Sequence, residues 1–164
     1  MLQIKAFFDD KTSTVTYLVW DPATREAAII DPVLDYEPHA ARLTTTSVDS
    51  VLDVAADLGL KVVWALDTHA HADHLSATHH IHEVTGAKVG IGARITEVQR
   101  VFSSMFHATD VCPNGGAFNE LFDDGETFAL GDLTVRVMHT PGHTPACVTY
   151  VIDDAAFVGD TMFM

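Results

Sequence analysis

The sequence predicts a single α+β domain spanning residues 1–164, and two features of the chain indicate this fold class. Residues 3–8, 14–20 and 27–30 are short stretches rich in Val, Ile, Phe, Tyr and Thr, a composition typical of strands. Farther along, apolar residues recur at helical spacing before strand patterns return. With 164 residues, 48% of them hydrophobic, the chain has the size and apolar content to bury a substantial core.

The first three strands are separated by turn residues, which predicts an antiparallel meander. Between Val48 and Leu58 the apolar residues follow helical spacing, so we expect an amphipathic helix. Thr46 or Ser47 is its predicted N-cap, and Gly59 stands where a C-terminal glycine belongs.

The remaining elements follow in order along the chain. A buried strand is predicted at 61–66, a helix at 77–85 ended by Gly86, a strand at 87–91 and a helix at about 94–106. From residue 126 the pattern changes to hairpins, with strands predicted at 126–130, 133–139, 147–152 and 155–159. The chain then ends directly after a strand, so we expect a domain that is incomplete at its C-terminus.

Charge and composition exclude several classes of protein. The formal net charge is -14, from 23 acidic and 9 basic residues, which argues against nucleic acid as a partner. No apolar run approaches the roughly 20 residues of a membrane helix, and the N-terminus lacks the features of a signal peptide, so we expect no membrane partner and a cytoplasmic location. Cys112 and Cys147 are far apart and form no CxxC pair. Any metal must therefore use His and carboxylate ligands, and the chain has ten histidines.

Residues 68–74, with the sequence THAHADH, follow the predicted strand at 61–66 and concentrate possible metal ligands. In an extended backbone, residues two apart point to the same side, so His69 and His71 can converge on one cation. Asp73 and His74 would turn toward a neighbouring point. A solvated loop is the alternative, but four clustered ligand types after a buried strand favour a metal site.

The other histidines carry weaker signals. His79, His80 and His82 lie on the predicted helix at 77–85, where an exposed face is expected rather than coordination. His39 and His107 are assigned no role.

Two further segments offer ligands at strand ends. In residues 140–145 (TPGHTP), His143 stands at the apex of a tight turn, whereas His139 lies earlier, within the strand, and is expected to be structural. Asp160 follows an apolar strand, where an Asp is costly to bury unless it is paired or binds a metal.

These segments together resemble the metallo-β-lactamase superfamily. THAHADH matches the HxHxDH motif of that family, residues 140–144 (TPGHT) match the next ligand turn, and residues 159–161 (GDT) match the bridging-aspartate segment. The resemblance implies a four-layer αβ/βα sandwich with the metal site between two sheets, of which this chain carries the N-terminal half and the start of the second sheet. The last metal-binding His of two-metal members would lie beyond Met164.

Within this superfamily, residues 66–77 and 139–150 look most like the persulfide dioxygenase branch, including the forms that accompany rhodanese domains. That resemblance implies that His69, His143 and Asp160 bind one Fe(II) as a two-His, one-carboxylate set with open positions for oxygen and a thiolate-type substrate. Glutathione persulfide would be oxidised to sulfite. The residues that would orient the ligands and tune the iron are His71, Asp73 and His74.

Glyoxalase II, a hydrolase of glutathione thioesters, shares these motifs and supplies a second hypothesis. It implies two zinc ions: the first would be bound by His69, His71 and His143, the second by Asp73 and His74, with Asp160 as the bridge. Asp73 and His74 are also the expected catalytic residues. A third hypothesis is an inactive fragment that associates through its unfinished sheet.

The implied partners are a small-molecule thiol or persulfide substrate and O2. A homodimer and a rhodanese-type domain are further candidates. An anionic glutathione substrate needs a locally positive pocket, which the sequence does not reveal. The sequence also leaves the metal open, because the same His and carboxylate set accepts iron, zinc or manganese.

Overall fold

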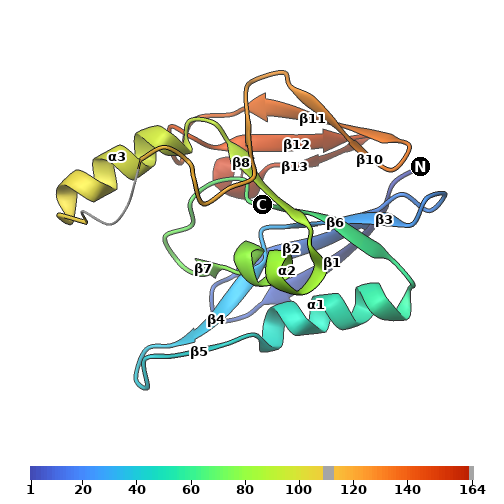
Figure 1. The fold of residues 1–164 in the computed structure, drawn as a ribbon, viewed down its shortest axis with the longest axis horizontal. Helices are drawn as coiled ribbons and strands as arrows, with labels where there is room; N and C mark the ends of the chain where they lie inside the picture. Colours follow the sequence, from blue (N-terminus) through green and yellow to red (C-terminus); the bar gives the residue numbers. More distant parts are fainter. Residues whose placement is uncertain (109–112, 163–164) are drawn as a thin grey trace.

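Two β-sheets lie face to face in the computed structural model, which describes residues 1–108 and 113–162 (Figure 1). Helices α1 (Thr46–Asp57) and α2 (Thr78–Thr85) cover the outer face of the larger sheet, and α3 (Ile95–Met105) lies at the side of the sandwich (Figure 1). The described residues therefore form a helix layer and two sheet layers.

The larger sheet begins with the predicted antiparallel meander, which is confirmed. It consists of β1 (Gln3–Asp9), β2 (Thr14–Trp20) and β3 (Glu26–Ile30). Parallel strands then extend the sheet beside β3, in the order β6 (Lys61–Leu66), β8 (Lys88–Gly92) and β9 (Glu120–Phe122). The sheet is thus mixed, and its parallel strands β3, β6, β8 and β9 all end at the same edge.

The smaller sheet consists of the predicted hairpins, and all its neighbouring strands pair antiparallel. Its strands are β10 (Thr127–Leu130), β11 (Leu133–His139), β12 (Val148–Ile152) and β13 (Ala155–Phe157). The last strand is shorter than predicted because Gly159–Thr161 turn into a single 3-10 turn, η1.

A third, three-stranded sheet was not predicted. It contains β4 (Val33–Glu37), β5 (Arg42–Thr44) and the short β7 (Leu75–Ser76). Residues 38–41, between β4 and β5, read PHAA, and Pro38 interrupts the strand pattern of this hairpin in the sequence.

Two hydrophobic clusters fix the layers. One lies between the sheets and joins side chains such as Val19, Leu66 and Phe122 of the larger sheet to Val137 and Tyr150 of the smaller one. The other packs helices α1 and α2 onto the opposite face of the larger sheet. Because β-strand side chains alternate between faces, a strand such as β6 can supply both clusters.

The helices agree with the predicted positions, but the cap of α1 differs. Its N-cap residue is Thr45, and Asp35 of β4 accepts hydrogen bonds from the backbone N–H and the hydroxyl of Ser47 at 2.8 and 2.7 Å. Gly59 follows the helix at φ +64, as its predicted role requires. Cys112 lies outside the described residues. No helix within the described ranges has the length and apolarity needed to cross a membrane.

Candidate metal centre

The three predicted ligand segments meet at one edge of the sandwich. The first follows β6 of the larger sheet, and the other two follow β11 and β13 of the smaller sheet. The carbonyl of Thr68 accepts a hydrogen bond from the backbone N–H of Val148 at 2.9 Å, which ties the histidine loop to β12. Packing of the two sheets thus brings together residues that are far apart in the sequence.

His69, His143 and Asp160 form the first cluster, which we call the sheet-spanning group. Asp160 Oδ2 lies 3.8 Å from His69 Nε2 and 3.5 Å from His143 Nε2. All three offer ligand atoms within 4.8 Å of one another, a spacing that suits a shared cation. His69 is buried, whereas the other two side chains are about one-third exposed, so the cluster opens to solvent on one side.

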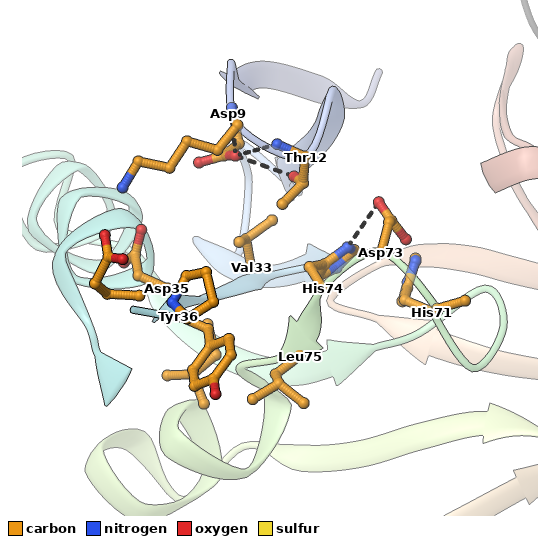
Figure 2. Close-up of a pocket in the computed structure, with 14 residues that line it drawn as sticks. Asp9, Thr12, Val33, Asp35, Tyr36, His71, Asp73, His74 and Leu75 are labelled. Carbon is orange, nitrogen blue, oxygen red and sulfur yellow. Dashed lines mark hydrogen bonds and ion pairs between the residues drawn. The ribbon is translucent and has the colours of Figure 1, made fainter. Parts of the chain in front are cut away.

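His71, Asp73 and His74 form the second cluster, the loop group, and also offer ligand atoms within 4.8 Å of one another. Figure 2 shows Asp73 bonded to His74 with His71 beside them; the distance from His74 Nδ1 to Asp73 Oδ2 is 3.3 Å. The Thr14 hydroxyl at the start of β2 donates to the same Asp73 oxygen at 3.1 Å. The ring centroid of His71 lies 4.0 Å from that of His69 and 4.2 Å from that of His74, so the groups adjoin.

Two buried ring nitrogens test whether these clusters suit a metal. Nε2 of His69 and Nε2 of His74 have no hydrogen-bond partner among the described residues, although both atoms are buried. Such an atom costs free energy unless something binds it, and an imidazole nitrogen is a common ligand for transition metals. With carboxylates beside both rings, the donor set fits a metal site built from His and Asp ligands.

Asp31 was not predicted as a site residue, but its hydrogen bonds stabilise the conformation of the histidine loop. Its Oδ1 accepts hydrogen bonds from the backbone N–H of Thr68 at 2.7 Å and from His71 Nε2 at 3.0 Å. Its Oδ2 accepts the Thr68 hydroxyl at 2.9 Å. Asp31 is buried and has φ +51, an uncommon conformation for a residue other than glycine, which marks a constrained position. The signal in the sequence was an Asp directly after the apolar strand β3.

The charge of Asp31 changes the protonation of its neighbours. Burial disfavours a charged His71, but the hydrogen bond and charge of Asp31 outweigh this and raise the pKa of His71. Burial, and then the charge of His71, lower the pKa of His69 to about 4 and also lower that of His74. His69 and His74 are therefore neutral at pH 7, the form in which imidazole binds metal.

Asp67 is a second buried carboxyl that the sequence reading missed. It accepts hydrogen bonds from Ser76 Oγ at 2.8 and 3.0 Å, and its backbone carbonyl accepts one from the Tyr150 hydroxyl at 2.9 Å. Burial raises the pKa of Asp67 to about 7. It thereby connects the histidine loop to β7 and to the smaller sheet.

Gly159 allows the aspartate segment to approach the histidine loop. It has φ +49, and a Cβ at this position would collide with the side chain of Thr68. The glycine of the GDT segment thus permits the close contact that places Asp160 beside His69.

Hydrogen bonds within residues 139–147 stabilise the turn that carries His143. Cys147 Sγ accepts the backbone N–H of Thr144 at 3.2 Å, and His139 Nε2 donates to the carbonyl of Pro145 at 2.9 Å. His139 therefore closes the turn.

The helix histidines differ from the prediction in part. His79 is exposed as expected, but His80 and His82 are half-buried. His80 forms a hydrogen bond with Asp49 Oδ1 at 3.1 Å, and His82 forms one with the carbonyl of Ala87 at 2.8 Å. None of the three belongs to a ligand cluster among the described residues.

Comparisons with known proteins agree with this geometry. The model of the Metallo-beta-lactamase superfamily matches residues 9–164. A protein of Burkholderia pseudomallei named "Probable metallo-hydrolase" is 47% identical over 99% of this chain and 59% of its own length. Human "Persulfide dioxygenase ETHE1, mitochondrial" is 31% identical over 98% of this chain and 53% of its own length.

Among solved structures, ETHE1 from Myxococcus xanthus superposes with a TM-score of 0.78 at 31% identity. The match covers 99% of this chain and 59% of that one. The chain thus spans a little over half the length of these relatives.

Proposed function

This chain belongs to the metallo-beta-lactamase superfamily, and we propose that it is a metal-dependent enzyme, a mononuclear Fe(II) persulfide dioxygenase. The proposed substrate is glutathione persulfide or a similar low-molecular-weight persulfide. The balanced reaction is GSS⁻ + O2 + H2O → GSH + SO3²⁻ + H⁺, in which the outer sulfur loses four electrons and O2 accepts them.

The convergence of His69, His143 and Asp160 carries this proposal. Two imidazoles and one carboxylate on one face of a cation are the ligand set of non-haem Fe(II) oxygenases, and this set needs no ligand from outside residues 1–162. Bound there, Fe(II) would supply oxygen activation and a coordination position for the persulfide sulfur. The likeness to human persulfide dioxygenase and to the Myxococcus xanthus structure supports the same assignment.

The residues of the loop group have a separate task in this proposal. Asp73 accepts a hydrogen bond from His74 Nδ1, which leaves the lone pair of Nε2 directed into the protein. The lowered pKa of His74 keeps that ring neutral, so Nε2 can accept the proton that a persulfide or a water loses. The hydrogen bond of His71 to Asp31 fixes the ring between His69 and His74.

A dinuclear zinc hydrolase of glutathione thioesters is the second candidate. The loop group favours it, because His71, Asp73 and His74 form another three-residue cluster beside the first. The 47% identity to a protein named as a metallo-hydrolase also supports a hydrolase. In this case the two clusters would share the work of binding two zinc ions.

Metal content and substrate consumption separate these candidates. The full chain would be purified anaerobically without added metal and its metals measured per chain. About one iron, with oxygen uptake and sulfite release from glutathione persulfide, is the result expected for the dioxygenase. About two zincs, with thioester cleavage and no oxygen uptake, would overturn it in favour of the hydrolase. No metal and neither activity would overturn both and favour the inactive fragment. The cytoplasmic location, the homodimer and the rhodanese-type partner stay predictions.

A further inference from the structure

A cavity of about 500 Å³ adjoins the loop group (Figure 2). The β1–β2 turn, strand β4 and residues 71–75 of the histidine loop form its walls. Its volume lies within the range of roughly 300–1,000 Å³ typical of small-molecule sites. His69, His143 and Asp160 do not line it, so the cavity is a separate space beside the sheet-spanning group.

The cavity has a partly apolar wall that the fold leaves uncovered. Val33 is buried, but Tyr36 is 50% exposed and Leu75 48% exposed, and all three line the cavity. Figure 2 shows Tyr36 and Leu75 side by side below Val33. Large apolar side chains at this exposure form a surface that a bound molecule could bury.

The polar lining is mainly acidic, with oxygens left for a ligand. Asp9 Oδ1 accepts hydrogen bonds from the backbone N–H groups of Lys11 and Thr12, and Glu37 Oε1 accepts that of His39. No donor among the described residues reaches Asp9 Oδ2 or Glu37 Oε2. Lys11 is exposed, and no carboxylate in the described ranges lies within 4.0 Å of its ammonium group. The cavity therefore offers both signs of charge, with the negative sign in excess.

His74 joins the cavity to the candidate metal centre. It lines the cavity while its side chain is only 1% exposed, and its buried Nε2 has no partner among the described residues. A molecule in the cavity would thus contact the loop whose other end carries His69.

We propose that this cavity binds the α-amino-acid head group of a low-molecular-weight thiol substrate, with its ammonium group facing Glu37 and Asp9 and its carboxylate facing Lys11. This proposal rests on the proposed function only in assuming a thiol-type substrate. The excess of carboxylates explains the choice: a purely anionic group would be repelled, whereas a zwitterionic head group finds a partner for each charge. The apolar wall would cover the methylene groups of the same molecule.

Binding of an unreactive analogue tests this without turnover. S-methylglutathione, which carries no persulfide sulfur and no thioester, would be titrated into the metal-loaded full chain by calorimetry. Glu37→Gln and Lys11→Met should each weaken its binding about 2- to 5-fold, as expected for exposed charge pairs. Glu83→Gln and Lys61→Met are matched controls, because these exposed residues lie outside the cavity, and they should leave the affinity unchanged.

A change on the ligand provides a second, independent readout. N-acetyl-S-methylglutathione lacks the ammonium charge and should bind the unaltered chain about 2- to 5-fold more weakly, and Glu37→Gln should reduce this difference, with Asp9 left to face the ammonium group. Equal affinities for the two ligands, or no binding of either, would overturn the proposal. The binding titration does not depend on turnover. A chain that binds S-methylglutathione in this way but takes up no oxygen with glutathione persulfide would therefore contradict the dioxygenase proposal and leave the cavity proposal standing.

Discussion

The sheet-spanning group and the loop group offer the same ligand types, yet they are assembled in different ways. His71, Asp73 and His74 come from one loop, and their bonds run to Asp31 and to the start of β2 within the same half of the molecule. The members of the sheet-spanning group follow three different strands of two sheets. Their convergence therefore depends on how the sheets pack.

Because of this difference, the two groups should be sensitive to substitutions at different places. A change at the contact between sheets should disturb the sheet-spanning group and spare the loop group, and a change near β2 should do the reverse. Asp31 is common to both, because it bonds Thr68 next to His69 as well as His71. Substitutions at these places test whether the two groups are assembled independently.

The largest effect is expected from His69→Ala. It removes the buried ring whose Nε2 faces Asp160, so metal affinity should fall more than about 100-fold. Metal per chain, measured after dialysis at fixed free metal, should drop to nearly nothing. His79→Ala is the control, because His79 is exposed on α2 and belongs to no ligand cluster of the described residues. Full metal content in His69→Ala would show that the sheet-spanning group is not the binding site.

Asp31→Asn should act on both groups. The amide can still accept the N–H of Thr68 but loses the charge that stabilises protonated His71. We expect metal affinity to fall about 10- to 100-fold, the usual cost of losing a group that orients ligands. Competition with a chromophoric chelator measures this, and unchanged affinity would contradict the role given to Asp31.

Gly159→Ala should act on the sheet-spanning group alone. The positive φ and the collision with Thr68 are expected to cost about 1–3 kcal/mol of unfolding free energy and to displace Asp160. Gly142→Ala is a matched control, since a Cβ there meets no atom within 4 Å. Urea unfolding of the metal-free chain compares them, and equal losses in both variants would refute the close-contact explanation.

The buried Asp67 should make the metal-free chain less stable as pH rises. Its pKa is about 7 in the folded chain and lower when unfolded. Its contribution is complete below the unfolded pKa and is lost as pH rises through about 7, with a limiting slope of about 1.4 kcal/mol per pH unit. Between about pH 5 and pH 7, unfolding free energy should therefore fall more steeply in the unaltered chain than in Asp67→Asn. Parallel profiles would rule out a titrating Asp67.

The smallest effect is expected from Thr14→Val, which removes a hydroxyl that bonds the loop group only. Unfolding free energy should fall by about 1 kcal/mol, with a change in the NMR signals of His74 and little change in those of His143. Thr134→Val on β11 is a control far from the loop. Equal shifts at both histidines would show that the two groups are coupled.

Much of the fold and the ligand types could be predicted because they depend on short-range patterns. Alternating apolar residues predicted the meander and the hairpins, and helical spacing predicted α1, α2 and α3 within a few residues. The four histidine-loop ligand candidates, His143 and Asp160 were identified from residue type and place at strand ends. The hairpin of β4 and β5 was not predicted, because its short strands show no clear alternation of apolar and polar residues.

The order of the segments along the chain thus specified which side chains are available, and the packing of two sheets specified which of them meet. Asp31 and Asp67 acquire their importance from burial beside His71, and burial depends on neighbours distant in sequence. The cavity beside the loop group likewise exists only where the β1–β2 turn, β4 and residues 71–75 come together. Local periodicity determines secondary structure, whereas the distance between two side chains from different strands also depends on how the sheets and helices pack together.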